Sequence, residues 1–527
     1  MAQEIMTLSE AARFVRVSEK TLGDLARSGR IPARKVGREW RVVRQALEDW
    51  LAGRLESKGK VGIWEKESQQ GALSVADPLV QYGLPFTGLR DTAFTENRDR
   101  TLHRWVPWIA GFSAGFVDEV LERAGAGRKT LTVLDPFAGV GTTLVEALKH
   151  GHDAFGFEIN PYAALACRAK TAAASYDVAL LQEKIASFKR YAAARVAKGD
   201  QTPESTAPNG FASRVPFFSP NVERQVLICL DFINAETTEW VRDLLRVAFG
   251  SVMVSFSNYS YEPSLGTRAA AGKQDVLHAD VINVVGRKLQ EMCEDIVTVQ
   301  DWMGKLPHVP RARIFGKSFF DSAGEIKPRS VDVLITSPPY LNNYHYIRNT
   351  RPHMFWLGMV ELPSDLKEME KKSFGQFWQT VRSGPEIALR PKVPELSRLI
   401  EELRKRNVEK GAYGGSGWAN YAASYFNDCE RFCDLTHGLM RTGGTAVVVI
   451  GNNILQGVEF KTDKFFAEIA QQKGFEIVEL HEVRKKRTGN SIVNSSVRSG
   501  TVKERTRLYE TAVEMRVACT KVARSGR

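Results

Sequence analysis

Cysteine is scarce in this chain and forms no metal-binding pattern. Six cysteines are scattered over 527 residues, and the closest pair, Cys429 and Cys433, has no further Cys or His at ligand spacing. We therefore expect neither zinc nor another metal, and no disulfide framework. This cysteine usage fits a protein of the reducing cytoplasm.

Long hydrophobic runs are also absent. No apolar stretch reaches the roughly 20 residues that a membrane-spanning helix needs. The polar start Met1–Glu4 is unlike a signal peptide. The sequence shows no internal repeat and no nuclease motif. We expect no membrane partner.

Acidic residues are outnumbered by basic ones. There are 61 Asp and Glu against 73 Lys and Arg, which gives a formal net charge of +12 and a pI near 9.3. This balance suits a polyanionic partner, although many basic proteins bind no nucleic acid. The length suffices for two to four domains, and the 43% hydrophobic content is ordinary for a globular protein.

The most informative stretch is 331–340, Val-Asp-Val-Leu-Ile-Thr-Ser-Pro-Pro-Tyr. Its apolar, β-branched first part predicts a buried strand. Ser337-Pro338-Pro339-Tyr340 continues it neither as helix nor as strand, because each proline fixes φ and removes a hydrogen-bond donor. In an open α/β sheet, ligands bind at the carboxyl ends of the strands. We therefore expect a ligand site at this tetrapeptide.

These residue types suit the exocyclic amine of a nucleic-acid base. Such an amine is a poor nucleophile because its lone pair is delocalised into the ring. If Ser337 Oγ and the Pro338 carbonyl each accept one of its hydrogens, the nitrogen regains its lone pair and can attack a methyl sulfonium held in line. Tyr340 would stack on the base once the base has left the duplex. Taken alone, the tetrapeptide is equally consistent with a Pro-rich turn that has no chemistry.

A second motif favours the chemical interpretation. Residues 131–143, Leu-Thr-Val-Leu-Asp-Pro-Phe-Ala-Gly-Val-Gly-Thr-Thr, predict a strand, a glycine-rich turn and the start of a helix. Gly139 and Gly141 allow the backbone to approach a ligand closely. A second strand, 155–157, ends at Glu158, whose carboxylate can bond both ribose hydroxyls of a cofactor. The combination is far more specific than either motif alone.

Asp135-Pro136-Phe137-x-Gly139-x-Gly141-Thr142-Thr143, followed by Thr336-Ser337-Pro338-Pro339-Tyr340, resembles the amino-methylating DNA methyltransferases. This N4-cytosine/N6-adenine family uses S-adenosylmethionine. The similarity runs over about residues 80–520 and includes 102–108, 346–349 and 443–452. It implies an α/β fold with a doubly wound, Rossmann-like sheet and helical insertions. The cofactor motif precedes the catalytic motif, so the motif order is the unpermuted one.

The resemblance also implies a set of site residues. The catalytic loop is Ser337, Pro338, Pro339 and Tyr340. The cofactor-binding residues are Asp135, Phe137, Gly139, Gly141, Thr142, Glu158 and Phe112, and the nearby Trp105, Trp108 and Phe116 are either pocket wall or plain core. One departure is that the family often has Gly-Asp after its third strand, where the acid meets the adenine amine. This chain has Gly316-Lys317 there, so that contact is missing or is supplied from elsewhere.

Several functions remain open at this stage. In the family, the serine form of the catalytic motif is commoner with cytosine N4, so N4-methylcytosine is the expected product and adenine N6 the alternative. No cysteine follows a proline, so the nucleophile of cytosine C5 methyltransferases is absent. RNA-base and protein-glutamine methyltransferases share an Asn/Asp-Pro-Pro-Tyr loop. A DNA-binding regulator with an inactive methyltransferase domain is the non-enzyme alternative.

Double-stranded DNA is the expected partner, and a cognate restriction enzyme is a further candidate. The expected location is the cytoplasm, in association with the nucleoid. Residues 1–51 resemble an excisionase-type winged helix-turn-helix. Thr7-Leu8-Ser9-Glu10 predicts a capping box that opens a helix, and 31–43 predict a hairpin about Gly37. The implied DNA contacts are Lys20, Thr21 and Arg27 on the second helix, and Lys35, Arg38 and Arg41 on the wing.

A small protein-docking domain is the alternative for this unit. Residues 52–76 predict a linker. Residues 77–527 form the expected methyltransferase domain, and two insertions, about 170–310 and about 361–420, are candidate target-recognition regions. The C-terminal stretch 475–517 predicts two strands joined by a basic loop that carries Arg484–Arg487, Arg498 and Arg505.

The first insertion predicts helices at 178–197 and 221–254. A polar-aromatic loop, 255–264, follows the second of these stretches. It is either a DNA surface or a plain surface loop. The second insertion predicts a charged helix at 396–406 and a flexible glycine-rich run at 411–417. That insertion is a lid, a target-reading element or an ordinary linker.

Overall fold

The computed structural model divides the chain into two compact units, Met1–Leu84 and Pro85–Arg527. It describes residues 5–47 in part, residues 508–518, and residues 94–486 apart from short gaps at 109–110, 112, 126–129, 198–201, 262–263 and 342–344. The linker predicted at 52–76 lies outside the described residues.

The first unit holds a small antiparallel sheet and a capped helix. In sheet order its strands are β1 (Ile5–Thr7), β3 (Glu39–Val43) and β2 (Ala33–Val36). The predicted capping box is confirmed at the start of α1 (Leu8–Phe14), because Glu10 N donates to Thr7 Oγ1 at 3.3 Å and Thr7 N donates to Glu10 Oε2 at 2.8 Å. Val36 pairs with Glu39, so the predicted hairpin is confirmed.

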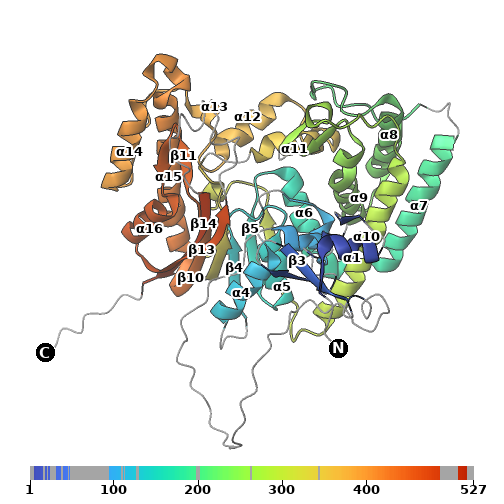
Figure 1. The fold of residues 1–527 in the computed structure, drawn as a ribbon, viewed down its shortest axis with the longest axis horizontal. Helices are drawn as coiled ribbons and strands as arrows, with labels where there is room; N and C mark the ends of the chain where they lie inside the picture. Colours follow the sequence, from blue (N-terminus) through green and yellow to red (C-terminus); the bar gives the residue numbers. More distant parts are fainter. Residues whose placement is uncertain are drawn as a thin grey trace, which may run out of the picture. The chain divides into compact units, whose positions relative to one another are not determined.

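A seven-stranded sheet forms the centre of the second unit (Figure 1). In sheet order its strands are β13 (Phe475–Lys486), β14 (Leu508–Val517), β10 (Met440–Gly451), β9 (Val331–Thr336), β4 (Thr132–Asp135), β5 (Asp153–Phe157) and β8 (Ala312–Phe315). The strands from β10 to β8 pair in parallel, whereas β14 runs antiparallel to both of its neighbours. The predicted doubly wound α/β fold is confirmed.

The strand order reverses between β4 and β9. From β4 the chain adds β5 and then β8 on one side, whereas β9 pairs with the other side of β4 and β10 follows it. Ligands bind outside the carboxyl ends of the strands at such a reversal. The two sequence motifs directly follow β4 and β9, so the topology brings them together.

Helices cover both faces of this sheet. Side chains alternate between the faces of a strand, so Leu134 and Leu334 face one layer, while Val133 and Val333 face the other. The first layer contains α15 (Gly415–Leu439) and α16 (Thr462–Gln472). The second contains α4 (Ala114–Gly125) and α5 (Thr142–Lys149). The result is a three-layer α/β/α domain.

The first insertion is a helical bundle with its own apolar core. Its long helices are α7 (Val178–Ala197), α8 (Pro220–Ala235), α9 (Glu239–Val252) and α10 (Val281–Gly304). They pack with α6 (Pro161–Thr171) and α11 (Tyr346–Trp356) around that core. The helix predicted at 178–197 is confirmed.

The polar-aromatic loop predicted at 255–264 is not a plain surface loop. Its Ser257 and Asn258 are buried, and Asn258 Nδ2 donates to the Pro216 carbonyl at 3.0 Å. The stretch forms η4 (Met253–Phe256) and then β6 (Tyr259–Tyr261), which pairs with β7 (Leu265–Thr267). The polar side chains supply the partners that buried backbone groups require.

The second insertion is helical and well packed. Its elements are α12 (Pro363–Lys372), α13 (Trp378–Val381), α14 (Pro394–Arg404) and η7 (Val408–Tyr413). The prediction of a flexible glycine run was wrong. A Cβ on Gly415 would lie 1.9 Å from the Leu403 carbonyl oxygen, and one on Gly417 would lie 2.1 Å from that of Ala412. The glycines are therefore needed for the close approach at the start of α15.

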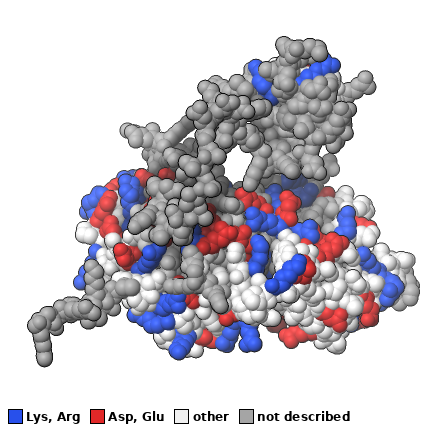
Figure 2. Space-filling model, turned by 90° about the horizontal axis from the view of Figure 1, so that it is seen from below, with Lys and Arg blue, Asp and Glu red and all other residues white. Residues whose placement is uncertain are grey.

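The C-terminal strands β13 and β14 confirm the pair predicted within 475–517. The basic loop between them, with Arg487, Arg498 and Arg505, lies outside the described residues. Basic and acidic side chains intermix over the described part of the face in Figure 2, so the positive net charge is not gathered there. Among the described helices, none combines the length and hydropathy needed to cross a bilayer.

Candidate active site

The carboxyl ends of four adjacent strands line one cavity of about 110 Å³. Pro136–Val140 follow β4, Phe157–Asn160 end β5, Lys317–Phe319 follow β8, and Ser337 and Pro339 follow β9. Other parts of the chain complete the wall with Trp108, Gly111, Thr142, Tyr346, Ile347, Lys372–Phe374 and Phe377. The cavity therefore joins both sequence motifs.

The turn after β4 places backbone amides at the cavity. Gly139 has a φ of +51°, in the region that favours glycine, and its N–H donates to Glu158 Oε2 at 2.8 Å. The Trp108 ring covers Gly139, because an added Cβ would lie 3.3 Å from Trp108 Nε1. Gly141 has a different role from the one predicted. It does not line the cavity, and an added Cβ would lie 2.7 Å from Cys167 Sγ on α6, so its lack of a side chain lets α5 and α6 pack.

Glu158 is the acid of the cavity. Its Oε1 accepts from Asn160 N at 2.7 Å and its Oε2 accepts from Gly139 N, so two backbone donors fix the carboxylate. Burial raises the pKa of Glu158 to about 7, although these bonds act in the opposite direction. Each carboxylate oxygen keeps a lone pair that can accept from a ligand hydroxyl.

Asp135 is a brace and does not line the cavity. Its Oδ1 accepts from Thr336 Oγ1 at 2.6 Å and from Phe137 N at 3.0 Å. These bonds tie the end of β4 to the end of β9, directly before Ser337. Burial raises the pKa of Asp135 to about 6. The sequence predicted Asp135 as a cofactor contact, whereas the structure places it behind the contact residues.

The segment 102–108 is held by an acid from the first insertion. Asp295 on α10 accepts from Leu102 N at 2.8 Å, from Trp105 Nε1 at 2.9 Å and from the Arg104 guanidinium at 2.6 Å. Trp105 and Phe116 are fully buried and belong to the core. Trp108 lines the cavity and stacks on Tyr346, with ring centroids 6.0 Å apart. Phe112 lies outside the described residues.

The loop after β9 contributes Ser337 and Pro339 to the cavity, whereas Pro338 is buried. Ser337 Oγ donates to the Tyr340 hydroxyl at 3.4 Å, which leaves Oγ able to accept. Tyr340 was expected to stack on the base, but its ring does not face the cavity. Its ring packs against Gly451 on β10, where an added Cβ would lie 3.2 Å from the ring, and it does not line the cavity. Tyr346 and Phe377 are the rings that line the cavity on this side.

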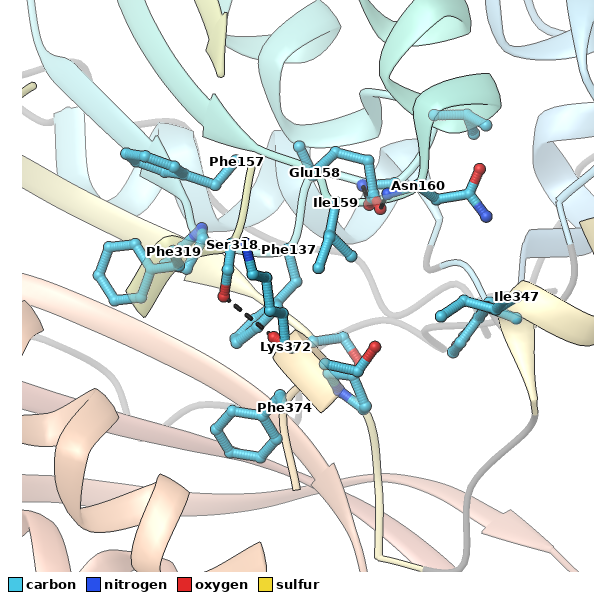
Figure 3. A pocket seen from close by; sticks show the side chains of 18 of the residues that line it. Phe137, Phe157, Glu158, Ile159, Asn160, Ser318, Phe319, Ile347, Lys372 and Phe374 are labelled. Carbon is cyan, nitrogen blue, oxygen red and sulfur yellow. Dashed lines mark hydrogen bonds between the residues drawn. The ribbon is translucent and has the colours of Figure 1, made fainter. Parts of the chain in front are cut away.

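The second insertion closes the β8 side of the cavity (Figure 3). Ser318 Oγ donates to the Lys372 carbonyl at 3.1 Å, and Phe374 packs edge to face on Phe137, with centroids 5.2 Å apart. Lys317 stands where the family often has an acid. Its ammonium group pairs with Glu325 at 2.6 Å. In place of that acid, the hydroxyl of Ser318 and the carbonyl of Lys372 are the polar groups nearby.

The structure brings together Phe137, Gly139, Thr142, Glu158, Ser337 and Pro339, and it leaves Asp135, Gly141, Pro338 and Tyr340 behind the lining. Sequence reasoning missed Ser318, Lys372, Phe374 and Phe377 as cavity residues. Long loops and the second insertion bring these to the site. The sequence signals for this wall were the Tyr-Ile-Arg-Asn motif at 346–349 and the aromatic residues of the second insertion.

Most of the predicted contacts of the N-terminal unit lie outside the described residues, namely Lys20, Thr21, Arg27 and Arg38. Lys35 lies on β2 opposite Trp40. Arg41 lies on β3, and its guanidinium donates to the Trp40 carbonyl at 3.3 Å. Lys35 and Arg41 therefore lie on the hairpin that was predicted as the wing, and their role in binding DNA stays a prediction.

Known proteins resemble this chain in two parts. Residues 5–55 match the family described as "Helix-turn-helix domain". Over 449 residues the chain is 23% identical to the type II methyltransferase M.BsoBI of Geobacillus stearothermophilus, covering 76% of this chain and 83% of that protein. It is 22% identical over 418 residues to the type II methyltransferase M.AvaI of Nostoc sp., covering 74% and 82%. The type II methyltransferase M.MvaI of Kocuria varians is 27% identical over 217 residues, covering 39% and 45%.

Proposed function

We propose that this chain, a relative of type II methyltransferases, methylates an exocyclic amine of a DNA base, with cytosine N4 as the main candidate. The methyl donor is S-adenosylmethionine, which supplies an electrophilic methyl group on a sulfonium. The observation that carries the proposal is that Ser337 lines the same cavity as Gly139 and Glu158. An acceptor for an amine and a binding surface for a nucleotide-like cofactor therefore line the same cavity.

The cavity residues fit S-adenosylmethionine. Gly139 lines the cavity and has no side chain, so its backbone can approach a ligand closely. Glu158 is held by two amides with lone pairs left for ribose hydroxyls. Ile159 and Phe319 offer apolar surface for the adenine, and Phe374 closes the cavity below them. We assign Ser318 and the Lys372 carbonyl to the adenine edge, in place of the family's acid.

Ser337 would prepare the target amine. If Ser337 Oγ accepts one of its hydrogens, the nitrogen lone pair is freed for attack. The N–C bond forms as the S–C bond breaks, and the surplus proton of the nitrogen leaves to water. Tyr346, stacked on Trp108 at the cavity wall, is better placed than Tyr340 to pack on the extruded base.

Adenine N6 is the second candidate substrate, because both amines flank a ring nitrogen and the same acceptors serve either one. The match of residues 5–55 to a helix-turn-helix domain favours DNA over RNA or protein as the substrate. In this proposal, the helix-turn-helix unit binds DNA, with or without preference for a sequence, and takes no part in methyl transfer. An inactive regulator would not need Glu158, Gly139 and Ser337 around one cavity.

The test is methyl transfer from labelled S-adenosylmethionine to unmodified genomic DNA. We expect Ser337→Ala to lower transfer by roughly 10² to 10³, the typical effect of removing one preorganised hydrogen-bonding group. Cofactor affinity should stay unchanged, since Ser337 contacts the base. Transfer at the wild-type rate by Ser337→Ala would exclude this assignment. The absence of any transfer to DNA by the wild-type chain would overturn the function itself.

A further inference from the structure

A second hollow opens beside the candidate active site, and it is basic. The segment 211–217, the β6–β7 hairpin and α11 surround a groove of about 460 Å³. In Figure 1, α11 lies between α12 and the helices of the first insertion. We call this hollow the arginine groove, after Arg214, Arg348 and Arg351, which line it.

Among the described residues, the three arginines of the groove have no acidic partner. Arg214 and Arg348 are exposed, and Arg351 is half-buried. None of the described residues that line the groove is acidic, and no ion pair joins these three arginines to a described carboxylate. Elsewhere in the described part of the chain, many surface arginines do pair with acids, for example Arg313 with Glu325 and Arg398 with Glu402. The described lining of the groove therefore carries positive charge that no described carboxylate compensates.

Hydrogen bonds and a cation–π contact hold the walls of the groove in place. The Arg351 guanidinium donates to the Ala212 carbonyl and lies over the Phe211 ring at 5.1 Å. Arg214 N donates to the Tyr259 hydroxyl at 3.0 Å. Partial burial and the charge of Arg348 lower the pKa of Arg351, as expected for cations held close together.

The groove is coupled to the catalytic loop through α11. That helix begins at Tyr346, which lines the candidate active site, and the β6–β7 hairpin is fastened to it at Asn349. Leu265 N donates to Asn349 Oδ1 at 2.7 Å, and the Tyr261 hydroxyl donates to the Asn349 carbonyl at 3.2 Å. A helix rises about 1.5 Å per residue, so Arg348 and Arg351 lie about 3 and 8 Å along the axis from Tyr346. Nucleotides of one strand follow each other every ~3.4 Å of duplex axis, so this reach is about one to two nucleotides.

We propose that the arginine groove binds the backbone phosphates of the DNA strand that carries the target base, next to the extruded nucleotide. This inference rests on the proposed function and adds the surface that holds the substrate strand. Guanidinium groups match phosphate oxygens in geometry and charge. The aromatic rings of the groove are not free to stack on bases, because Phe217 packs on Phe211 at 5.5 Å and on Tyr259 at 5.2 Å. Phosphate, not the bases, is therefore the group that the groove holds.

The test compares three full-length chains: the wild type, the double variant Arg214→Gln/Arg348→Gln, and the control variant Arg190→Gln. Arg190 is an exposed arginine on α7 that pairs with no acid among the described residues, and it lies outside the groove. Arg351 stays unchanged because it holds the Ala212 carbonyl. Affinity for a labelled duplex of mixed sequence is measured over a salt series. S-adenosylmethionine affinity is measured alongside as the check on folding.

We expect the double variant to bind DNA roughly tenfold or more weakly and to lose up to about two from the slope of log K against log salt, since each phosphate contact contributes ~0.9. Cofactor affinity and the Arg190→Gln chain should match the wild type. If the double variant has the DNA affinity and salt slope of the wild type, the groove does not bind phosphate. The proposed methyl transfer would be unaffected by that result. A wild-type chain that neither binds nor methylates DNA would overturn both proposals.

Discussion

Glu158 is the residue on which the cofactor assignment depends most. Burial raises its pKa to about 7, so the carboxylate is ionised above neutral pH and largely protonated below it. Only the ionised form accepts two ribose hydroxyls with full strength. We therefore expect S-adenosylmethionine affinity to fall as the pH drops from about 8.5 to about 6.

Glu158→Gln is the matched variant for that measurement. It should bind the cofactor roughly tenfold more weakly at high pH, because a hydrogen bond to a charged group contributes about 1.5–3 kcal/mol. The difference from the wild type should shrink as the pH falls below 7, since both side chains are then neutral. Calorimetry that finds the same ratio of dissociation constants at every pH would remove Glu158 from the cofactor site.

Single residues differ in how far the sequence could predict them. Gly139, Glu158 and Ser337 belong to local motifs that follow strands, and the topology of parallel strands brings such ends together. Asp135 and Gly141 belong to the same motif, but one braces β9 and the other packs on Cys167. A motif gives the neighbourhood of a residue, whereas the partner that it meets comes from a distant part of the chain.

The second insertion shows what sequence reasoning misses at the scale of elements. A glycine-rich run is typical of a flexible linker, yet Gly415 starts a 25-residue helix against the backbone of α14. The pattern itself cannot separate glycine used for freedom from glycine used for close approach. Helix α7, by contrast, was predicted at its observed bounds because its periodic apolar residues pack on one core.

We expect Gly415→Ala to destabilise the chain by several kcal/mol, because the new methyl would overlap the carbonyls of Leu403 and Arg406. Gly438→Ala is the control in the same helix, where an added Cβ meets nothing within 4 Å. That change should be neutral or stabilising by up to about 1 kcal/mol. Thermal unfolding decides between these outcomes, and equal midpoints for the two variants would contradict the packed glycine run.

At the scale of the whole molecule, the chain combines a helix-turn-helix unit with a separate α/β unit. We expect removal of residues 1–76 to leave cofactor binding intact, because the cavity lies entirely within the second unit. DNA affinity should fall and its salt dependence should flatten, since phosphate contacts set that slope. A truncated chain that binds and methylates DNA like the full one would make the first unit a protein-docking module.

The fold class was predictable because it follows from the order of the two motifs and their strands. The shape of the substrate side was not, since it depends on two insertions whose helices give no sign of what they pack against. The polar-aromatic loop illustrates this, because Ser257 and Asn258 turned inward to satisfy buried backbone. The arginine groove is formed instead by three arginines from distant parts of the chain, Arg214 before α8 and Arg348 and Arg351 on α11.

The most direct measurement is mass spectrometry of nucleosides from DNA modified by this chain. The account predicts N4-methylcytosine, whose yield falls with Ser337→Ala while cofactor binding persists. N6-methyladenine alone would keep the mechanism and change the base. Detection of 5-methylcytosine as the product would contradict the account, because methylation at ring carbon needs a nucleophile that the cavity around Ser337 does not provide.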